Sequence, residues 1–246
     1  MTGATATVQS KKGFRPSFHL WMALAMCGFI FGGFGLTYLG PLATGRFAPA
    51  PPIVHLHGVV FFGWMVLLVV QSLLVNVKNV RLHRSLGTYG IAHAGVLVFL
   101  GLLITILSAN TPDWTEDAYG LFYLSCVAPV SFTALFALAI RAVKTPPVHR
   151  NLMLLATLGI LMPGINRLYM MGFELGHVPF LATYATMDVM LAAILLNERT
   201  LTGTTSRALW IGAAIILVPQ ALLPVVTSWP VFRAFCHGLG SLAYYR

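Results

Sequence analysis

Long apolar runs constrain the fold of this 246-residue chain more strongly than any other feature of its sequence. A helix needs about 20 apolar residues to cross the roughly 30 Å hydrocarbon layer of a bilayer. Seven stretches reach or approach that length, at about residues 19–42, 54–77, 87–109, 119–142, 151–172, 179–197 and 208–227. Each is predicted to be a transmembrane helix. The sixth is the shortest and contains Asp188, so the sequence leaves open whether it crosses completely.

The composition agrees with a membrane protein. Hydrophobic residues make up 58% of the chain and charged residues only 9%, against roughly 25% charged residues in a soluble domain. So few charges could not cover a water-exposed surface. The net charge of +9 would suggest nucleic acid as the partner of a soluble protein, but here the basic residues gather in loops on one side. We therefore expect an all-α bundle of seven transmembrane helices, with the lipid bilayer and no nucleic acid as its partner.

The positions of lysine and arginine predict the orientation of the chain. Eleven of the fifteen basic residues fall in the N-terminal segment and in the loops after the second, fourth and sixth spans. Because cytoplasmic loops carry the excess of Lys and Arg, the N-terminus is predicted to be cytoplasmic and the C-terminus outside, in the inner membrane of a bacterium. We expect a cytoplasmic tail at 1–18, a seven-helix transmembrane domain at 19–227 and an outer amphipathic tail at 228–246.

Polar residues in the apolar runs fall at two depths when the predicted helices are placed side by side at about 1.5 Å per residue. The outer level contains His55, His57, Asn166 and Arg167, with Glu174 and His177 beyond them and Asp188 nearer the middle of the sixth span. Charged side chains inside a membrane are usually paired, so Arg167 is predicted to pair with Asp188. In the alternative, Arg167 reaches outward to Glu174 or to lipid phosphate.

The inner level contains Gln71 and His93 at similar depth, with His83-Arg84 and His149-Arg150 near the cytoplasmic ends of their helices. His57, Trp64 and Gln71 are spaced by seven residues, so they share one face of the second helix. That face is predicted to point into the bundle and to connect the two levels. Each group also has an ordinary structural interpretation. The His-Arg pairs could be interfacial anchors, Trp64 could be packing, and His93 could be a neutral histidine bonded to Gln71.

Several cofactors and activities are disfavoured by what the sequence lacks. Retinal needs a lysine within the last helix to form a Schiff base, and neither Lys78 nor Lys144 lies in a predicted span. The three cysteines have no paired spacing, and no P-loop, GxSxG or HExxH motif is present. The sequence therefore excludes retinal and does not decide whether the protein is an enzyme.

Haem b and quinone are the cofactors that best match the remaining residues. A low-spin haem needs two imidazoles at one depth on different helices, with basic residues near its propionates. The candidates are His93 and His149 for the haem iron, Arg84 and Arg150 for the propionates, and His57 with Arg167 on the outer side. A quinone needs only a histidine or glutamine donor beside an apolar channel, which His93 and Gln71 would supply.

The sequence leaves three functions of different classes open. The first is electron transfer by a redox protein that binds haem b or quinone. The second is a cofactor-free protein that binds or transports protons or a small ligand through Arg167, Asp188 and His57. The third is an accessory subunit packed against a larger membrane complex, which the broad apolar faces and the lack of a sizeable soluble domain would allow.

Three motifs follow one another along the chain: HxHG at 55–58, LHRxLG at 82–87 and HRxLMLLAT at 149–157, with Asn166-Arg167 after them. Over about residues 54–200 they resemble an uncharacterised family of bacterial multi-pass inner-membrane proteins. The resemblance implies a seven-helix inner-membrane protein and brings no established activity. The chain is more loosely similar to cytochrome b561-type proteins, which hold two haems between histidine pairs on antiparallel helices. Four embedded histidines are not evident in this sequence.

Overall fold

The computed structural model describes residues 14–111, 113–173 and 180–242. Within these ranges the chain forms helices and contains no β-strand, which confirms the all-α fold class. Six helices in this part of the chain are long and apolar enough to cross a membrane. They are α1 with its continuation through η1 and α2 (Phe18–Ala43), α3 (Pro52–Asn76), α4 (Val80–Ser108), α5 (Glu116–Arg141), α8 (Phe180–Thr202) and α9 (Arg207–Ser228). The architecture is that of a multi-pass membrane protein.

The fifth predicted span is broken into two pieces. α6 (Pro146–Leu158) and α7 (Met162–Arg167), which continues as the π-helix η2 (Leu168–Gly172), meet at an angle of 48°. If this bent pair is one span, the described residues contain seven spans, and otherwise six. The continuous helix expected at 151–172 is therefore wrong. At the break, Ile160 and Leu161 donate to carbonyls three residues back, and Pro163 has no N–H with which to continue the helix.

Three helices begin or end at residues other than the limits of their apolar runs. α4 begins at Val80 and α6 at Pro146, rather than near 87 and 151, so both His-Arg pairs lie within helices. α8 continues to Thr202 instead of ending near 197 and reaches 23 residues, a length sufficient for crossing. The polar C-terminal end of α8 is stabilised by Glu198, which is only 3% exposed and accepts a hydrogen bond of 2.8 Å from the backbone N–H of Ser206.

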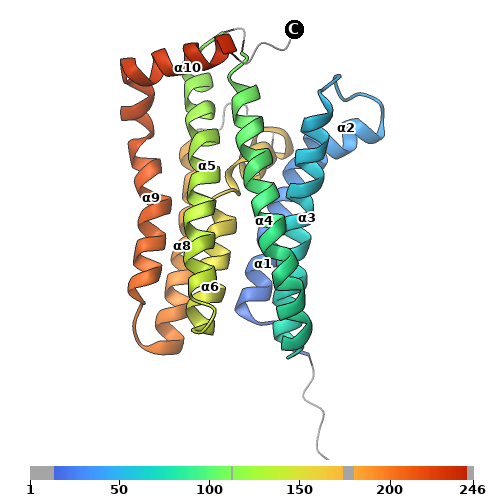
Figure 1. Ribbon diagram of the computed structural model, residues 1–246, viewed down its shortest axis with the longest axis vertical. Helices are drawn as coiled ribbons and strands as arrows, with labels where there is room; N and C mark the ends of the chain where they lie inside the picture. The colour runs from blue at the N-terminus through green and yellow to red at the C-terminus, as the bar shows by residue number, and fades with distance from the viewer. Residues whose placement is uncertain (1–13, 112, 174–179, 243–246) are drawn as a thin grey trace, which may run out of the picture.

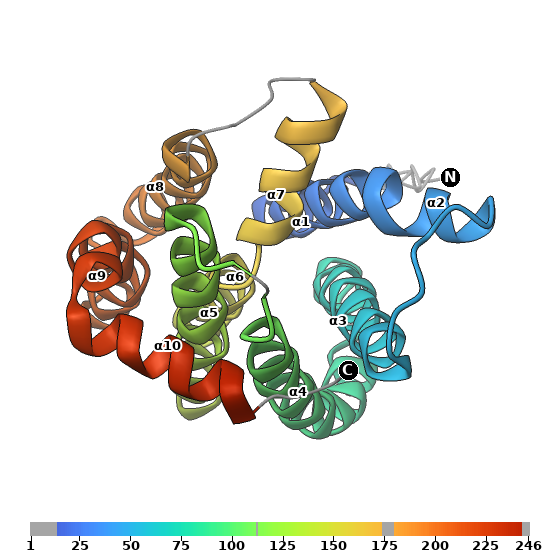
Figure 2. The same cartoon turned by 90° about the horizontal axis from the view of Figure 1, so that it is seen from above.

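α6 lies near the centre of the bundle, in contact with α1, α5, α8 and α9 (Figure 2). Beyond the break, α7 turns away from the centre and packs against α1. Glycines make this close approach possible. A Cβ atom on Gly164 of α7 would lie only 3.0 Å from Cα of Ile30 and 3.1 Å from the carbonyl oxygen of Phe29 in α1. Both halves of the broken helix thus contact α1 and α8, and α6 also packs against α5 and α9.

α10 (Pro230–Leu242) lies across one end of the bundle, opposite the end where α1 begins (Figure 1). Arg233 forms an ion pair of 2.6 Å with Glu116, and its guanidinium lies 4.5 Å from the centroid of the Tyr119 ring. Cys236 is fully buried, and burial raises the pKa of its thiol to about 11, so it packs as a protonated side chain at neutral pH. α10 falls within the predicted amphipathic tail, of which residues 243–246 lie outside the described ranges, as do residues 1–13 of the N-terminal tail.

Candidate functional site

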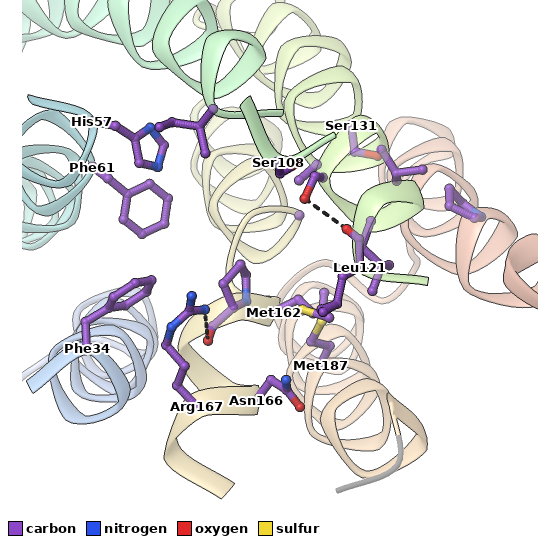
Figure 3. Close-up of a pocket in the computed structure, with 18 of the residues that line it drawn as sticks. Phe34, His57, Phe61, Ser108, Leu121, Ser131, Met162, Asn166, Arg167 and Met187 are labelled. Carbon is purple, nitrogen blue, oxygen red and sulfur yellow. Dashed lines mark hydrogen bonds between the residues drawn. The ribbon is translucent and has the colours of Figure 1, made fainter. Parts of the chain in front are cut away.

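A cavity of about 430 Å³ lies in the half of the bundle that carries α10. Its walls come from α1, α3, α4, α5, α7, α8 and α9, and most of the lining side chains are apolar (Figure 3). The cavity follows from the break in the fifth span. α6 fills the centre of the bundle up to Gly159, whereas α7 turns towards α1, so none of the described helices occupies the centre beyond the break.

Arg167 reaches into this cavity from the C-terminal end of α7 (Figure 3). Its Nη1 donates to the backbone carbonyl of Pro163 at 3.2 Å, and its guanidinium carbon lies 4.5 Å from the centroid of the Phe34 ring. A cation over an aromatic face is stabilised by about 0.5–2 kcal/mol. That is much less than the cost of moving a bare charge into hydrocarbon. Of the five N–H groups of this guanidinium, one has an acceptor among the described residues, so the others can donate to a ligand.

The predicted ion pair between Arg167 and Asp188 is wrong. Within the described ranges no ion pair joins the two side chains, and one carboxylate oxygen of Asp188 is buried without a hydrogen-bond partner. Asp188 lies on α8 and does not line the cavity, whereas α7 directs Arg167 towards α1 and α3. The alternative partner Glu174 lies outside the described residues, as does His177.

Besides Arg167, three of the polar side chains that line the cavity bear on the choice of ligand: Tyr184, Gln220 and His57. On the α8 and α9 walls, the hydroxyl of Tyr184 and the amide nitrogen of Gln220 are buried without a hydrogen-bond partner among the described residues. On the α3 wall, the His57 ring stacks on Phe61 with centroids 5.9 Å apart. The free groups of Arg167 and Gln220 can only donate hydrogen bonds, and the Tyr184 hydroxyl can donate as well. The cavity therefore presents donors to a ligand from separate walls.

The sequence singled out His57, Asn166 and Arg167, which line the cavity, and did not single out Tyr184 and Gln220. The polar atoms of Asn166 have partners: its Oδ1 accepts from Thr183 at 3.4 Å, and its Nδ2 donates to the sulfur of Met170 at 3.5 Å. Tyr184 and Gln220 were not predicted. The available signal was Gln220 itself, an amide within the apolar run 208–227 that must find a partner in the membrane.

The predicted polar face of the second span does turn inward, but an aromatic cluster interrupts it. Trp64 is 2% exposed, and its ring lies 5.1 Å from that of Phe132, centroid to centroid. Its indole N–H donates to Thr157 at 3.2 Å. His57 lines the cavity on one side of this cluster, and Gln71 lies about two turns beyond it on α3. In this structure Trp64 separates the two polar levels.

His93 does not bond Gln71, so that prediction is wrong. The Nε2 atom of His93 lies 2.8 Å from the carbonyl oxygen of Val60, and its Nδ1 lies 3.1 Å from the Tyr89 hydroxyl. The ring reaches the α3 backbone at Gly63, where a Cβ would lie 3.0 Å from its Cε1 atom. Gln71 lies eight residues further along α3, or about 12 Å at 1.5 Å per residue. Both ring nitrogens of His93 are thus occupied locally.

His149 lies beside His83, with ring centroids 6.5 Å apart and ring planes at 78°. His83 and His93 are ten residues apart on α4, which corresponds to about 15 Å along the helix. The structure therefore does not bring together the two imidazoles predicted to ligate haem iron. Of the predicted propionate partners, Arg84 is exposed, and Arg150 is half-buried, with no hydrogen-bond partner for its Nε atom in the described part of the chain.

Comparisons with known proteins do not assign the chain to a family. No protein-family description matches it, and neither a curated protein nor a solved structure does. Within the described part of the chain, no three or more His, Cys, Asp or Glu side chains gather as a metal site. What the cavity can do is therefore inferred from its geometry and chemistry.

Proposed function

We propose that this protein binds a lipid-soluble molecule with an anionic head group in the central cavity. The observation that carries the proposal is Arg167, a guanidinium on the wall of an apolar cavity between membrane-spanning helices, whose polar and aromatic partners among the described residues are one carbonyl and one ring. A charge in the membrane is costly unless it is paired. An anionic head group beside Arg167 would supply the missing partner.

The shape and lining of the cavity favour an amphipathic ligand. Its volume of about 430 Å³ is within the range of roughly 300–1,000 Å³ that is typical of small-molecule sites. The apolar walls suit a hydrocarbon body, and the free donors of Arg167, Tyr184 and Gln220 suit the acceptor oxygens of a carboxylate or phosphate. In this proposal the protein is a binding, sensing or transport protein for such a molecule.

A quinone is the second candidate, favoured by the placement of donors on separate walls. The carbonyl oxygens of a quinone ring point in opposite directions, so they could accept from Arg167 on one wall and from Tyr184 or Gln220 on the other. The cavity, rather than His93 with Gln71, is where such a head group would bind. Electron transfer would follow only in this second case.

We also propose that the chain crosses the bacterial inner membrane seven times, with α6 and α7 acting as one broken span. The loops and helix ends opposite α10 carry Lys78, Arg81, Arg141, Lys144 and Arg207. Because such residues are retained in the cytoplasm, that end of the bundle is proposed to be cytoplasmic and α10 to lie on the outer surface.

The ligand proposal is tested by comparing dodecanoate with dodecanol, which share an apolar chain and differ in the charge of the head group. Binding of both is measured by calorimetry to the whole protein in lipid nanodiscs. The wild-type protein should prefer dodecanoate. Replacing Arg167 with Gln should weaken dodecanoate binding about 10- to 100-fold, the equivalent of about 1.5–3 kcal/mol for a hydrogen bond to a charged group, and leave dodecanol unaffected.

Arg233→Gln is the matched control. Arg233 also lies 4.5 Å from an aromatic ring centroid, but at the end of the bundle and outside the cavity lining, so its loss should not change the preference. Equal binding of both compounds to the wild-type protein, or an unchanged preference in Arg167→Gln, would contradict the anionic ligand. Tight binding of a short-chain ubiquinone that depends on Tyr184 and Gln220 would instead support the second candidate.

A further inference from the structure

A second polar cluster lies at the end of the bundle away from the cavity. It consists of His83 on α4, His149 on α6 and Gln71 on α3, and we call it the inner histidine cluster. The two imidazole rings lie 6.5 Å apart, centroid to centroid, and the amide nitrogen of Gln71 donates to the backbone carbonyl of His83 at 3.2 Å. Three helices thus bring two imidazoles and an amide together.

Each imidazole has a nitrogen without a hydrogen-bond partner among the described residues. The Nδ1 of His149 lies 2.8 Å from the carbonyl oxygen of Ala139, and because a carbonyl only accepts, this nitrogen carries the proton. The Nε2 of a neutral His149 is then a lone-pair acceptor. The Nδ1 of His83 is buried without a hydrogen-bond partner among the described residues.

Gln71 adds a third acceptor to the cluster. Its amide nitrogen is engaged by the His83 carbonyl, which leaves its Oε1 buried with no hydrogen-bond partner in the described part of the chain. An amide oxygen accepts and never donates. Two imidazole nitrogens and one amide oxygen therefore lie within one cluster as unsatisfied acceptors, and a bound cation would satisfy all three together.

The ligand types indicate which cation. Imidazole nitrogen suits zinc, copper, nickel and cobalt, whereas magnesium and calcium prefer sites made of oxygen. With metal–nitrogen bonds of about 2.0–2.1 Å, two imidazoles on one tetrahedral ion have ring centroids about 5 Å apart, so the two rings, which are 6.5 Å apart in this structure, would move about 1 Å closer on binding. A ligating histidine usually donates its second nitrogen to a carbonyl, as His149 does.

We propose that His83, His149 and the amide oxygen of Gln71 bind a divalent transition-metal ion. The ion would link α3, α4 and α6 at the end of the bundle proposed to be cytoplasmic. With three protein ligands, a tetrahedral ion keeps one position for water or another small ligand. This inference is independent of the cavity and of its ligand.

The test uses the whole protein, purified in detergent through a tag without histidine and stripped with a chelator. Cobalt(II) is the probe, because its visible absorption reports nitrogen ligation, and zinc is the competitor. The wild-type protein should bind about one cobalt ion per chain, displaced by zinc, with the affinity reduced at least tenfold in His83→Ala and in His149→Ala. His55→Ala is the control, since His55 bonds Tyr38 outside the cluster and should not affect binding.

A variant that should bind the metal more tightly distinguishes a lost metal site from a misfolded protein. Gln71→Glu replaces the amide oxygen with a carboxylate, a stronger zinc ligand, and should tighten cobalt and zinc binding. Zinc should raise the unfolding temperature of the wild-type protein and of Gln71→Glu, but not that of His83→Ala. Cobalt binding equal in the wild type and in the double variant His83→Ala/His149→Ala would overturn the proposal. So would a haem Soret band that requires both histidines, because the ligand would then be haem iron.

Discussion

At the scale of single residues, Arg167 and Asp188 show what depth alone can and cannot predict. The sequence predicts a depth for each, because position along an apolar run translates directly into distance along a helix. They do not pair, because pairing also needs the two side chains to point at each other around their helix axes. Arg167 lies over Phe34 of α1, and Asp188 lies on α8 away from the cavity lining.

Replacing Asp188 with Asn is therefore expected to leave stability unchanged or to raise it by about 1 kcal/mol, since it removes a charge whose Oδ1 has no hydrogen-bond partner in the described structure. If Asp188 formed a buried ion pair, its removal would cost about 3–5 kcal/mol. Thermal unfolding in detergent separates the two outcomes. Glu116→Gln is the control, because it breaks an exposed ion pair and should cost under about 1 kcal/mol.

The histidines also show that depth along a helix does not predict which side chains meet. His93 was correctly placed within a membrane helix, but its partners are the Val60 carbonyl and the Tyr89 hydroxyl. Its access to Val60 depends on Gly63 of the neighbouring helix. His149 approaches His83 because α6 begins earlier than its apolar run suggests. Hydropathy carries no information on either contact, since both depend on which helices are neighbours.

At the scale of elements, the break between α6 and α7 decides where the site lies. Gly159 and Pro163 stand in an apolar run, so they do not interrupt its hydropathy, and the sequence predicted one helix there. The structure bends by 48° at this point and sends α7 against α1. The cavity and the position of Arg167 both follow from that change of direction.

The crossing of α1 and α7 predicts that alanine substitutions at two glycines of α1 affect stability differently. A Cβ on Gly33 would meet the backbone of Gly164 and lie 3.2 Å from Cβ of Arg167, whereas a Cβ on Gly28 would meet nothing within 4 Å. Gly33→Ala should destabilise the protein by about 1–3 kcal/mol through overpacking. Gly28→Ala should be neutral or stabilise by up to about 1 kcal/mol, the helix propensity gained.

Chemical or thermal unfolding measures both glycine variants under one condition. The two substitutions reduce the backbone freedom of the unfolded chain equally, so the difference between their free energies of unfolding reports the steric clash at Gly33. Gly33→Ala should also weaken dodecanoate binding, because Arg167 moves with α7. Equal stabilities of the two variants would mean that α1 and α7 do not cross at these glycines.

At the scale of the whole molecule, the described chain begins α1 at one end of the bundle and places α10 at the other (Figure 1). That arrangement agrees with the proposed topology, in which the broken α6–α7 pair is the seventh crossing. Seven crossings put the termini on opposite sides of the membrane, and six would put them on the same side.

Reporter fusions in a bacterial host test this topology. Green fluorescent protein should fluoresce when fused at the N-terminus, because it folds in the cytoplasm, and alkaline phosphatase should be active at the C-terminus, because it needs the oxidising outer compartment. A phosphatase fused in the loop after α3, near Lys78, serves as the control and should be inactive. Inactive phosphatase at the C-terminus, with fluorescent protein active there, would indicate an even number of crossings.

The sequence by itself determined that the chain is helical and enters the membrane several times, because an apolar run long enough to cross is a property of consecutive residues. It also predicted the depth of the polar residues for the same reason. The tertiary structure decided which of them meet, where the fifth span breaks, and that Tyr184 and Gln220 share a cavity with Arg167. Those outcomes depend on helix direction and on neighbours distant in the chain, so no local pattern contains them.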